Sequence, residues 1–200
     1  MINSRLLNSN LLLDCYKVGI FPMANSRDDK EIFFVDPDER GIIPLERLHI
    51  SKSLKKFMKN MKYEISFNKS FMEVIKNCAE PSLSRGETWI SHDIERLYCE
   101  LHDKGSAHSI EVWESENLVG GVYGMAIGGA FFGESMFSNK VNASKVALVK
   151  LVEQLINKNF VLLDTQFMTR HLQSMGGVEI SRENYQDLLN TALNVTTEFI

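Results

Sequence analysis

The chain has 200 residues and a net charge of −4; 44% of its residues are hydrophobic and 24% are charged. These proportions are ordinary for a globular protein, and the length suits one domain or one domain with a small addition. An acidic chain has no global field that attracts nucleic acid, so any such contact has to be local. No long apolar run predicts a membrane span and the polar N-terminus is unlike a secretory signal, so we expect a cytoplasmic protein.

The first 45 residues predict a small, loop-rich N-terminal domain. LLLDCYKVG is typical of one short helix that ends at Gly19, and three of the four prolines follow it, at Pro22, Pro37 and Pro44. These prolines and the DPD turn favour a compact segment with short extended pieces. We therefore predict a small domain over residues 1–45 and a larger domain over residues 46–200.

Residues 51–62, SKSLKKFMKNMK, predict an amphipathic helix that Ser51 or Ser53 caps. Five lysines crowd its polar face without any acid that would give i,i+4 support. Two interpretations stay open from this pattern alone, a solvated helix face and a surface that binds phosphate. The lysines are Lys52, Lys55, Lys56, Lys59 and Lys62.

The rest of the chain alternates helical and extended patterns. Further helices are expected at 70–80, 92–104, 143–159 and 181–193, and strands at 108–114, 116–127, 129–138, 160–166 and 177–180. Three antiparallel strands followed by a helix and another strand are typical of a layered domain. The predicted fold class is α+β, with helices and strands in α/β layers.

Several common kinds of site are not indicated. No two of the five histidines stand four residues apart on one helix, and the three widely spaced cysteines include no CxxC, so we expect small buried thiols and no metal. There is no GxSxG elbow, and the glycines of GGVYGMAIGG lie within predicted strands and not before a helix. Those glycines indicate that another group lies close to the strand backbone, and this group could be a substrate. We expect no cofactor.

Two apolar strands carry polar side chains. Glu134 follows AIGGAFFG, and Asp164 and Gln166 end the apolar strand in FVLLDTQ. A carboxylate in such surroundings has to be paired, hydrogen-bonded or functional, because burying it alone costs several kcal/mol. Residues two apart on a strand share a face, so Asp164 and Gln166 are expected to project together. A structural alternative stays open, in which Asp164 caps the next turn and Gln166 is a surface amide.

With these segments the chain resembles the leucyl/phenylalanyl-tRNA–protein transferase family. The resemblance extends over nearly the whole chain, and its most specific segments, LVGGVYG, GESMFS, NASKVAL and LLDTQ, stand in the expected order. It implies a small N-terminal domain followed by a domain similar to the acetyltransferase (GNAT) fold. It also implies transfer of Leu, Phe or sometimes Met from aminoacyl-tRNA to the α-amino group of proteins that begin with Arg or Lys. The product is an N-degron for protein degradation, and neither metal nor coenzyme is implied.

The resemblance also suggests catalytic roles. The residues that match Asp164 and Gln166 are assigned to a proton relay in the family. Because an amide is not basic enough to hold a proton, we expect the Gln166 carbonyl to orient the attacking amine, while Asp164 polarises it or accepts the proton through water. Glu134 matches the glutamate beside the acceptor, where a carboxylate suits the cation of Arg or Lys.

Other candidate contacts complete the predicted substrate site. The aromatics Trp89, Phe33 and Phe34 are expected to contact the acceptor and the terminal adenosine. The remaining substrate-binding candidates are Phe131, Met136, Leu151 and Leu155 in an apolar acyl pocket, together with Ser138. We expect Lys52, Lys55, Lys56 and Lys59 to hold the tRNA backbone without reading its sequence.

One segment departs from the family pattern, since FFVDPDER stands where the family reads close to WWSPDPR, with Arg40 retained.

Three alternatives remain beside the transferase. A CoA-dependent N-acetyltransferase of the same fold would need glycines before its helix, and VNASKVAL has none. A tRNA-binding relative without turnover would not need Glu134, Asp164 and Gln166. A transferase that acts on N-terminal Asp or Glu would place cations where Glu134 stands. No long exposed apolar helix is predicted, so we expect a monomer.

Overall fold

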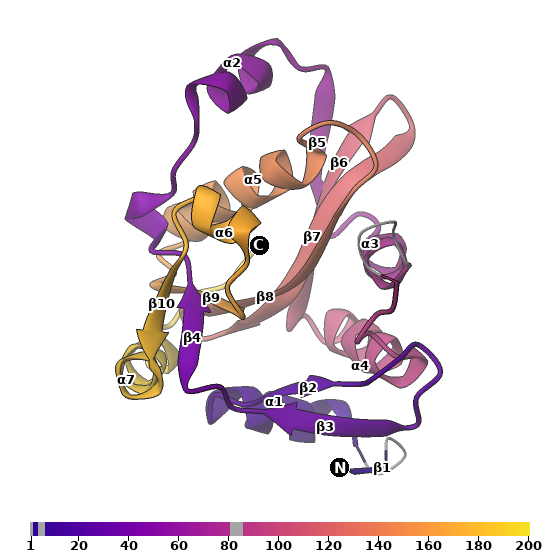
Figure 1. Cartoon of the computed structure of the whole chain (residues 1–200), viewed down its shortest axis with the longest axis vertical. Coiled ribbons are helices and arrows are strands. Elements are labelled where there is room, and N and C mark those ends of the chain that lie inside the picture. Colours follow the sequence, from indigo (N-terminus) through magenta and orange to yellow (C-terminus); the bar gives the residue numbers. More distant parts are fainter. Residues whose placement is uncertain (1, 4–6, 81–85) are drawn as a thin grey trace.

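A computed structural model describes residues 2–3, 7–80 and 86–200 of the chain (Figure 1). Residues 1 and 4–6 of the predicted N-terminal domain lie outside this part. The N-terminal region contains a helix and a small antiparallel sheet in the order β1-β3-β2. These elements are β1 (Ile2–Asn3), α1 (Ser9–Lys17), β2 (Phe21–Met23) and β3 (Glu31–Val35).

A larger sheet of seven strands follows, in the order β10-β4-β9-β8-β7-β6-β5. All neighbours are antiparallel except β8 and β9, which α5 connects and which run parallel. The strands are β4 (Glu39–Ile42), β5 (Tyr63–Phe67), β6 (Ala107–Glu114), β7 (Asn117–Ile127), β8 (Ala130–Ser138), β9 (Leu162–Gln166) and β10 (Val178–Ser181).

Helices cover both faces of this sheet. Figure 1 shows α5 on one side of the long strands β7 and β8 and α3 with α4 on the other. The helices are α2 (Lys52–Asn60), α3 (Phe71–Ala79), α4 (His92–Asp103), α5 (Ala143–Asn157), α6 (Arg170–Ser174) and α7 (Arg182–Leu193), with a short 3-10 helix η2 (Leu45–Arg47).

Strand alternation divides the apolar side chains between two cores. On β8, Phe131 packs in the core beneath α5, while its neighbour Phe132 packs in the core with α1, α3 and α4. Successive strand residues point to opposite faces, so both faces of this sheet carry apolar side chains and both are covered by the apolar sides of helices. The C-terminal Phe199 completes the α5 core.

The α+β class predicted from the sequence is confirmed, and the similarity to acetyltransferases stays a prediction. The division at residue 45 stays a prediction as well, and β4, which precedes that point, pairs with β9 and β10 of the large sheet. Ser51 caps α2 through the N–H of Leu54. Three elements of the described chain were not predicted: the short 3-10 helix η2, the strand β5, although YEISF alternates, and the single turn of α6.

Three further observations concern sites that the sequence disfavoured. No helix within residues 2–3, 7–80 and 86–200 has the length and apolarity to cross a membrane. The same residues contain no group of three or more His, Cys, Asp or Glu side chains that would suit a metal ion. None of the three cysteines, all in the described part of the chain, forms a disulfide; Cys78 is buried, but Cys15 and Cys99 are partly exposed, so the prediction of buried thiols is wrong for those two.

Candidate functional site

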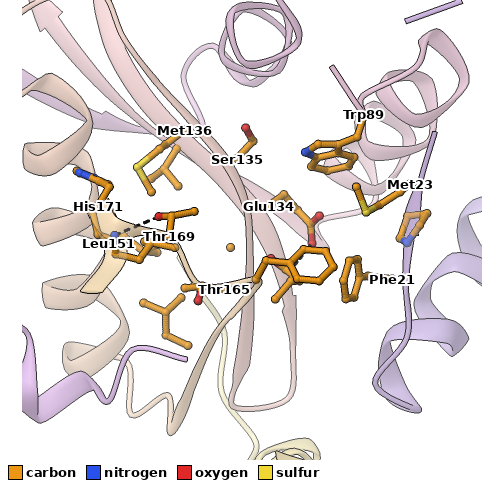
Figure 2. A pocket seen from close by; sticks show the side chains of 18 residues that line it. Phe21, Met23, Trp89, Glu134, Ser135, Met136, Leu151, Thr165, Thr169 and His171 are labelled. Carbon is orange, nitrogen blue, oxygen red and sulfur yellow. Dashed lines mark hydrogen bonds between the residues drawn. The ribbon is translucent and has the colours of Figure 1, made fainter. Parts of the chain in front are cut away.

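A pocket opens where the parallel strands β8 and β9 part. Their ladder runs from the pair Ala130–Leu162 to the pair Phe132–Asp164. Beyond that pair, residues 133–136 of β8 and residues 165–167 line the wall of a cavity of about 280 Å³ (Figure 2). The carboxyl ends of neighbouring parallel strands are a recurrent place for ligand sites in α/β sheets.

A bulge in β8 presents Glu134 to this pocket. In the ladder with β7, Tyr123 is opposite Ser135 and Gly124 is opposite Gly133, so Glu134 is the extra residue. A bulge of this kind redirects a side chain. Gly124 makes the close approach possible, because a Cβ atom there would lie 2.2 Å from the carbonyl oxygen of Phe132.

Two side chains, Tyr16 and Gln166, hold the Glu134 carboxylate by hydrogen bonds. Tyr16 donates its hydroxyl proton to Glu134 Oε1 at 2.6 Å, and Tyr16 is in turn hydrogen-bonded to Tyr98. Gln166 Nε2 donates to the same Oε1 at 3.2 Å. Burial raises the pKa of Glu134 to about 7, although hydrogen bonding within the group of Tyr16, Tyr98 and Glu134 acts in the opposite direction.

A second bulge places Gln166. In the ladder between β4 and β9, Gly41 is opposite Gln166 and Ile42 is opposite Asp164, which leaves Thr165 as the extra residue. Gln166 has a φ of 56°, in the left-handed region that costs a non-glycine residue on the order of 1 kcal/mol. Its backbone N–H donates to Asp164 Oδ1 at 2.8 Å, which holds this conformation.

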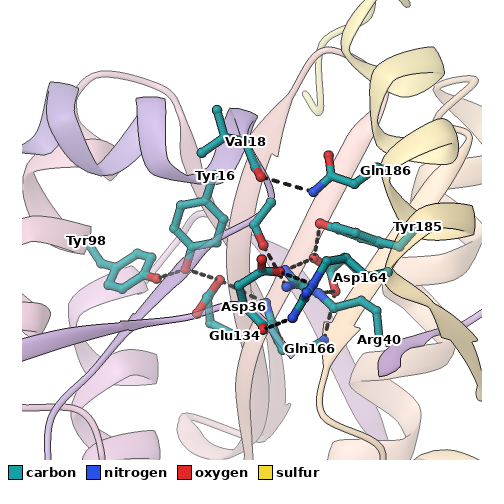
Figure 3. A network of polar contacts seen from close by, with 12 residues as sticks. Tyr16, Val18, Asp36, Arg40, Tyr98, Glu134, Asp164, Gln166, Tyr185 and Gln186 are labelled. Carbon is teal, nitrogen blue, oxygen red and sulfur yellow. Dashed lines mark hydrogen bonds and ion pairs between the residues drawn. The ribbon is translucent and has the colours of Figure 1, made fainter. Parts of the chain in front are cut away.

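Asp164 and Gln166 are therefore brought together by a turn and not by strand periodicity. The Gln166 amide faces Glu134, whereas the Asp164 carboxylate faces Arg40 and Tyr185 (Figure 3). The structural alternative that made Gln166 a surface amide does not describe this arrangement, because Gln166 is buried.

Asp164 belongs to a buried ion pair with Arg40. The Nε and Nη2 atoms of Arg40 donate to Oδ1 and Oδ2 at 3.0 and 2.7 Å, and neither side chain is more than 1% exposed. The guanidinium lies between the rings of Phe21 and Tyr185, 4.6 and 4.3 Å from their centroids. Burial alone would lower the pKa of Arg40, but Asp164 outweighs that effect and raises it.

The acceptor capacity of Asp164 is filled. Besides the two bonds from Arg40 and the backbone N–H of Gln166, it accepts a hydrogen bond from the Tyr185 hydroxyl at 2.8 Å. A carboxylate offers about four lone-pair sites, and four donors occupy them here. This arrangement suits a residue that positions its neighbours better than one that accepts a proton directly.

The inner wall of the pocket is apolar and receives two of the four predicted acyl-pocket residues. Met136 and Leu151 line it, together with Leu148, Leu163 and Leu172. Phe131 and Leu155 are fully buried in the core beneath α5 and are not part of this wall. A cavity lined by Leu and Met adapts to apolar side chains of different shape.

The rim of the pocket carries Trp89, but neither Phe33 nor Phe34. Those two residues lie on β3, opposite Met23 and Pro22 of β2. It is β2 that contributes to the pocket, through Phe21, Pro22 and Met23 (Figure 2). Phe167, which follows Gln166, is 47% exposed and adds a further aromatic ring.

Ser138 has a different neighbourhood from the one expected. Its hydroxyl donates to the Lys140 carbonyl at 2.9 Å and accepts the backbone N–H of Ser144 at 3.1 Å. Both contacts stabilise the start of α5, where the cap residue Asn142 makes no side-chain cap hydrogen bond. Ser138 is not one of the residues that line the pocket.

Family models and relatives agree on what this chain is similar to. The family model described as leucyl/phenylalanyl-tRNA protein transferase matches residues 42–190, and the model of its N-terminal domain matches residues 6–38. The chain belongs to this family.

Three curated relatives carry the name leucyl/phenylalanyl-tRNA–protein transferase. The relative from Rhodospirillum rubrum is 49% identical over 96% of this chain and 91% of its own length. The relatives from Maricaulis maris and Paramagnetospirillum magneticum are 51% and 50% identical, over 94% and 98% of this chain and 87% and 93% of their own lengths. The protein is thus a transferase of this family, with aminoacyl-tRNA and protein as the substrates that the family name implies.

Solved structures are more distant. One of a conserved protein of unknown function from Bacteroides thetaiotaomicron has a TM-score of 0.45 at 10% identity, covering 95% of this chain and 65% of its own. One of L-PGS from Bacillus licheniformis has a TM-score of 0.44 at 13% identity, covering 83% and 55%. At such scores the likeness carries no argument.

The predicted tRNA-binding lysines of this transferase lie together on α2. Lys52, Lys55, Lys56 and Lys59 are all exposed, whereas Leu54 is buried against the rest of the protein. Figure 1 shows α2 at one end of the molecule, beyond α5 and far from the small N-terminal sheet. The structure therefore presents a basic helix to solvent, and its contact with tRNA stays a prediction.

Sequence reasoning missed the side chains that hold the site together. Tyr16 and Tyr98 had the apolar neighbours and helical spacing of core residues, and both are indeed fully buried. Tyr185 likewise had no distinguishing signal within a terminal helix. Arg40 was noticed as a retained residue of DPDER, but nothing in that segment indicated that Asp164 is its partner.

Proposed function

We propose that this transferase moves Leu or Phe, and also Met, from aminoacyl-tRNA to the α-amino group of proteins with N-terminal Arg or Lys. One observation carries the proposal: Glu134 is a carboxylate on a bulge at a largely apolar pocket, next to Gln166. A cationic side chain is the partner that such a carboxylate needs. The new peptide bond would create an N-degron, and a tRNA donor fits a reaction in the cytoplasm.

The donor is an activated ester, so the protein need not supply a nucleophile. An α-amino group has a pKa of about 7.7–8.0, and roughly a tenth or more of it is neutral at pH 7. The amine nitrogen attacks the ester carbonyl carbon, the bond to the ribose oxygen breaks, and the proton lost by the amine ends on that oxygen. Alignment of the amine and the ester then contributes much of the rate.

Gln166 is placed to align the amine. Its Nε2 donates to Glu134, because an amide oxygen in that position would put two acceptors face to face. The Gln166 Oε1 is then the group that accepts a hydrogen bond from the amine and turns its lone pair toward the ester. In this proposal Asp164 acts through Gln166, since it holds the backbone N–H of that residue.

The apolar inner pocket is the proposed place for the transferred side chain. Met136 and Leu151 form part of its wall, and a cavity of about 280 Å³ has room for either Leu or Phe. Trp89 and Phe167 at the rim offer ring faces for the terminal adenine or the acceptor. No metal or coenzyme is needed for this chemistry.

A transfer assay tests the proposal. Labelled Phe-tRNA or Leu-tRNA is mixed with the protein and with peptides that begin with Arg, Lys, Asp or Ala, without added metal or CoA. We expect label on the Arg and Lys peptides, and at most traces on the others. Equal transfer to all four peptides would contradict the assignment of Glu134, and no transfer with tRNA still bound would indicate a binding protein without turnover.

The α2 lysines give a second test. Replacement of Lys52, Lys55, Lys56 and Lys59 by Gln is expected to weaken tRNA binding and to reduce the slope of log K against log salt by about 3, because each of four phosphate contacts contributes about 0.7–0.9 to that slope. The control replaces four exposed lysines elsewhere, Lys17, Lys30, Lys69 and Lys76, and changes the net charge equally. Binding measured from 50 to 200 mM salt compares them, and equal slopes in both variants would exclude α2 as the contact.

A further inference from the structure

Two buried tyrosines stand behind the pocket, and the proposed reaction does not use them directly. Tyr16 comes from α1 in the N-terminal region and Tyr98 comes from α4, and both side chains are 0% exposed. Their hydroxyls are hydrogen-bonded to each other, and that of Tyr16 continues to Glu134 (Figure 3). These two side chains do not only fill apolar space, because each brings into the core a hydroxyl group that needs a hydrogen-bond partner.

The direction of this chain follows from counting protons. Each phenol has one proton, and an ionised carboxylate only accepts. Because Tyr16 donates its proton to Glu134, the hydrogen bond between the tyrosines has Tyr98 as its donor. The order is therefore Tyr98 to Tyr16 to Glu134, and its last bond is strongest while Glu134 is ionised, because a charged acceptor forms a stronger hydrogen bond than a neutral one.

We propose that Tyr16 and Tyr98 are positioning residues that keep Glu134 ionised and aimed into the pocket, and thereby determine the selection of cationic acceptors. The inference rests on the proposed function, in which Glu134 pairs with Arg or Lys. It makes the N-terminal region a functional part of the site, since α1 supplies the hydroxyl that contacts Glu134. Neither tyrosine lines the pocket, so both act through the carboxylate.

The other charged groups around Glu134 do not replace this support. Arg40 on β4 favours its ionised form, while Asp164 on β9 opposes it, and these two are paired with each other. Tyr185 on α7 donates to Asp164 and not to Glu134. Gln166 donates to Glu134 but carries no charge. The tyrosine hydroxyls are thus the groups whose removal acts on Glu134 most directly.

Loss of the Tyr16 hydroxyl is expected to raise the pKa of Glu134 above about 7, since a hydrogen bond that favours the ionised form disappears. At neutral pH the carboxyl group of the variant then carries a proton and attracts a cation less. At a pH above its new pKa the carboxylate forms again. The defect of Tyr16→Phe is therefore expected to depend on pH, which a general packing defect would not.

The experiment compares kcat/KM for an Arg-initiated peptide between pH 6 and pH 9.5. The ratio of variant to wild type is used at each pH, because it cancels the ionisation of the acceptor amine, and Arg stays charged throughout. We expect Tyr16→Phe to lose about fivefold at pH 7 and to recover to within about twofold at pH 9.5, which corresponds to a rise of about one unit in the pKa of Glu134. Tyr98→Phe should show the same pattern with a smaller loss.

Two controls distinguish this role of the tyrosines from a general packing defect. Tyr63→Phe removes a hydroxyl that donates to the Val141 carbonyl away from the pocket, and its ratio should stay near one at every pH. The KM for aminoacyl-tRNA should be unchanged in all variants. A loss in Tyr16→Phe that is the same at every pH would overturn the inference. A wild-type protein without preference for Arg or Lys peptides would instead overturn the proposed function itself.

Discussion

Replacing Glu134 by Gln is expected to abolish the preference for Arg and Lys acceptors. Removing one partner of a buried, hydrogen-bonded charge pair costs about 2–5 kcal/mol, so kcat/KM for an Arg-initiated peptide should fall by at least about 30-fold. The amide retains the shape and can still accept the Tyr16 proton. The KM for aminoacyl-tRNA should change little, because the donor does not depend on this charge.

The same replacement is expected to stabilise the folded protein above neutral pH. Below pH 4.5 the carboxyl group is protonated in both folded and unfolded chains and costs nothing. Between about 4.5 and about 7 the unfolded chain loses this proton first, so the free energy of unfolding falls as pH rises, and above 7 the whole penalty is present. At 1.36 kcal/mol per pH unit this penalty is on the order of 3 kcal/mol, and Gln removes it.

Denaturant unfolding at pH 4.5 and pH 8 measures this effect. Glu134→Gln should be close to wild type at pH 4.5 and clearly more stable at pH 8. Glu153→Gln is the matched control, because Glu153 is an exposed residue that pairs with Lys150 on α5, and such surface pairs contribute less than about 1 kcal/mol. If Glu134→Gln is less stable than wild type at pH 8, the carboxylate supports the fold and is not held there at a cost.

Helices and strands could be predicted from the sequence where a hydrophobic pattern extended over many residues. Local periodicity and capping chemistry specified the amphipathic helix α5, the strands β6 to β8 and the cap Ser181 near their observed places. For α2 they offered two caps, Ser51 and Ser53, of which Ser51 is the one observed. The lone charged residue in each of two apolar strands also pointed to Glu134 and Asp164. These signals are local, and each needs only a few neighbouring residues.

The geometry of the site could not be predicted from local sequence patterns. Period-two reasoning placed Asp164 and Gln166 on one face, but the bulge at Thr165 and the left-handed backbone of Gln166 interrupt that period. Bulges depend on register between strands that are distant in sequence, as Gly124 and Gly133 show at Glu134. The partners Tyr16 and Arg40 come from segments 118 and 124 residues away from the carboxylates they contact, and no local pattern carries that information.

Replacing Arg40 by Met is expected to be the most destabilising single change at the site. Arg40 and Asp164 are both buried, and removal of one partner leaves an uncompensated charge that costs about 3–5 kcal/mol. The lost packing against Phe21 and Tyr185 adds to this, although Met fills part of the space. Thermal and denaturant unfolding should show the loss, with a midpoint well below that of wild type.

The double variant Arg40→Met, Asp164→Leu distinguishes the contribution of this ion pair to stability from its contribution to transfer activity. Apolar replacement of a whole buried ion pair is often neutral for stability, so most of the loss in Arg40→Met should be recovered. Transfer activity should not recover, because the Gln166 N–H has lost the oxygen that holds its left-handed conformation, and the side chain no longer stays beside Glu134. The fall is expected in kcat more than in the KM for either substrate. A double variant that is both stable and active would mean that Asp164 contributes only to folding, and Gln166 would then have to be positioned by Glu134 alone.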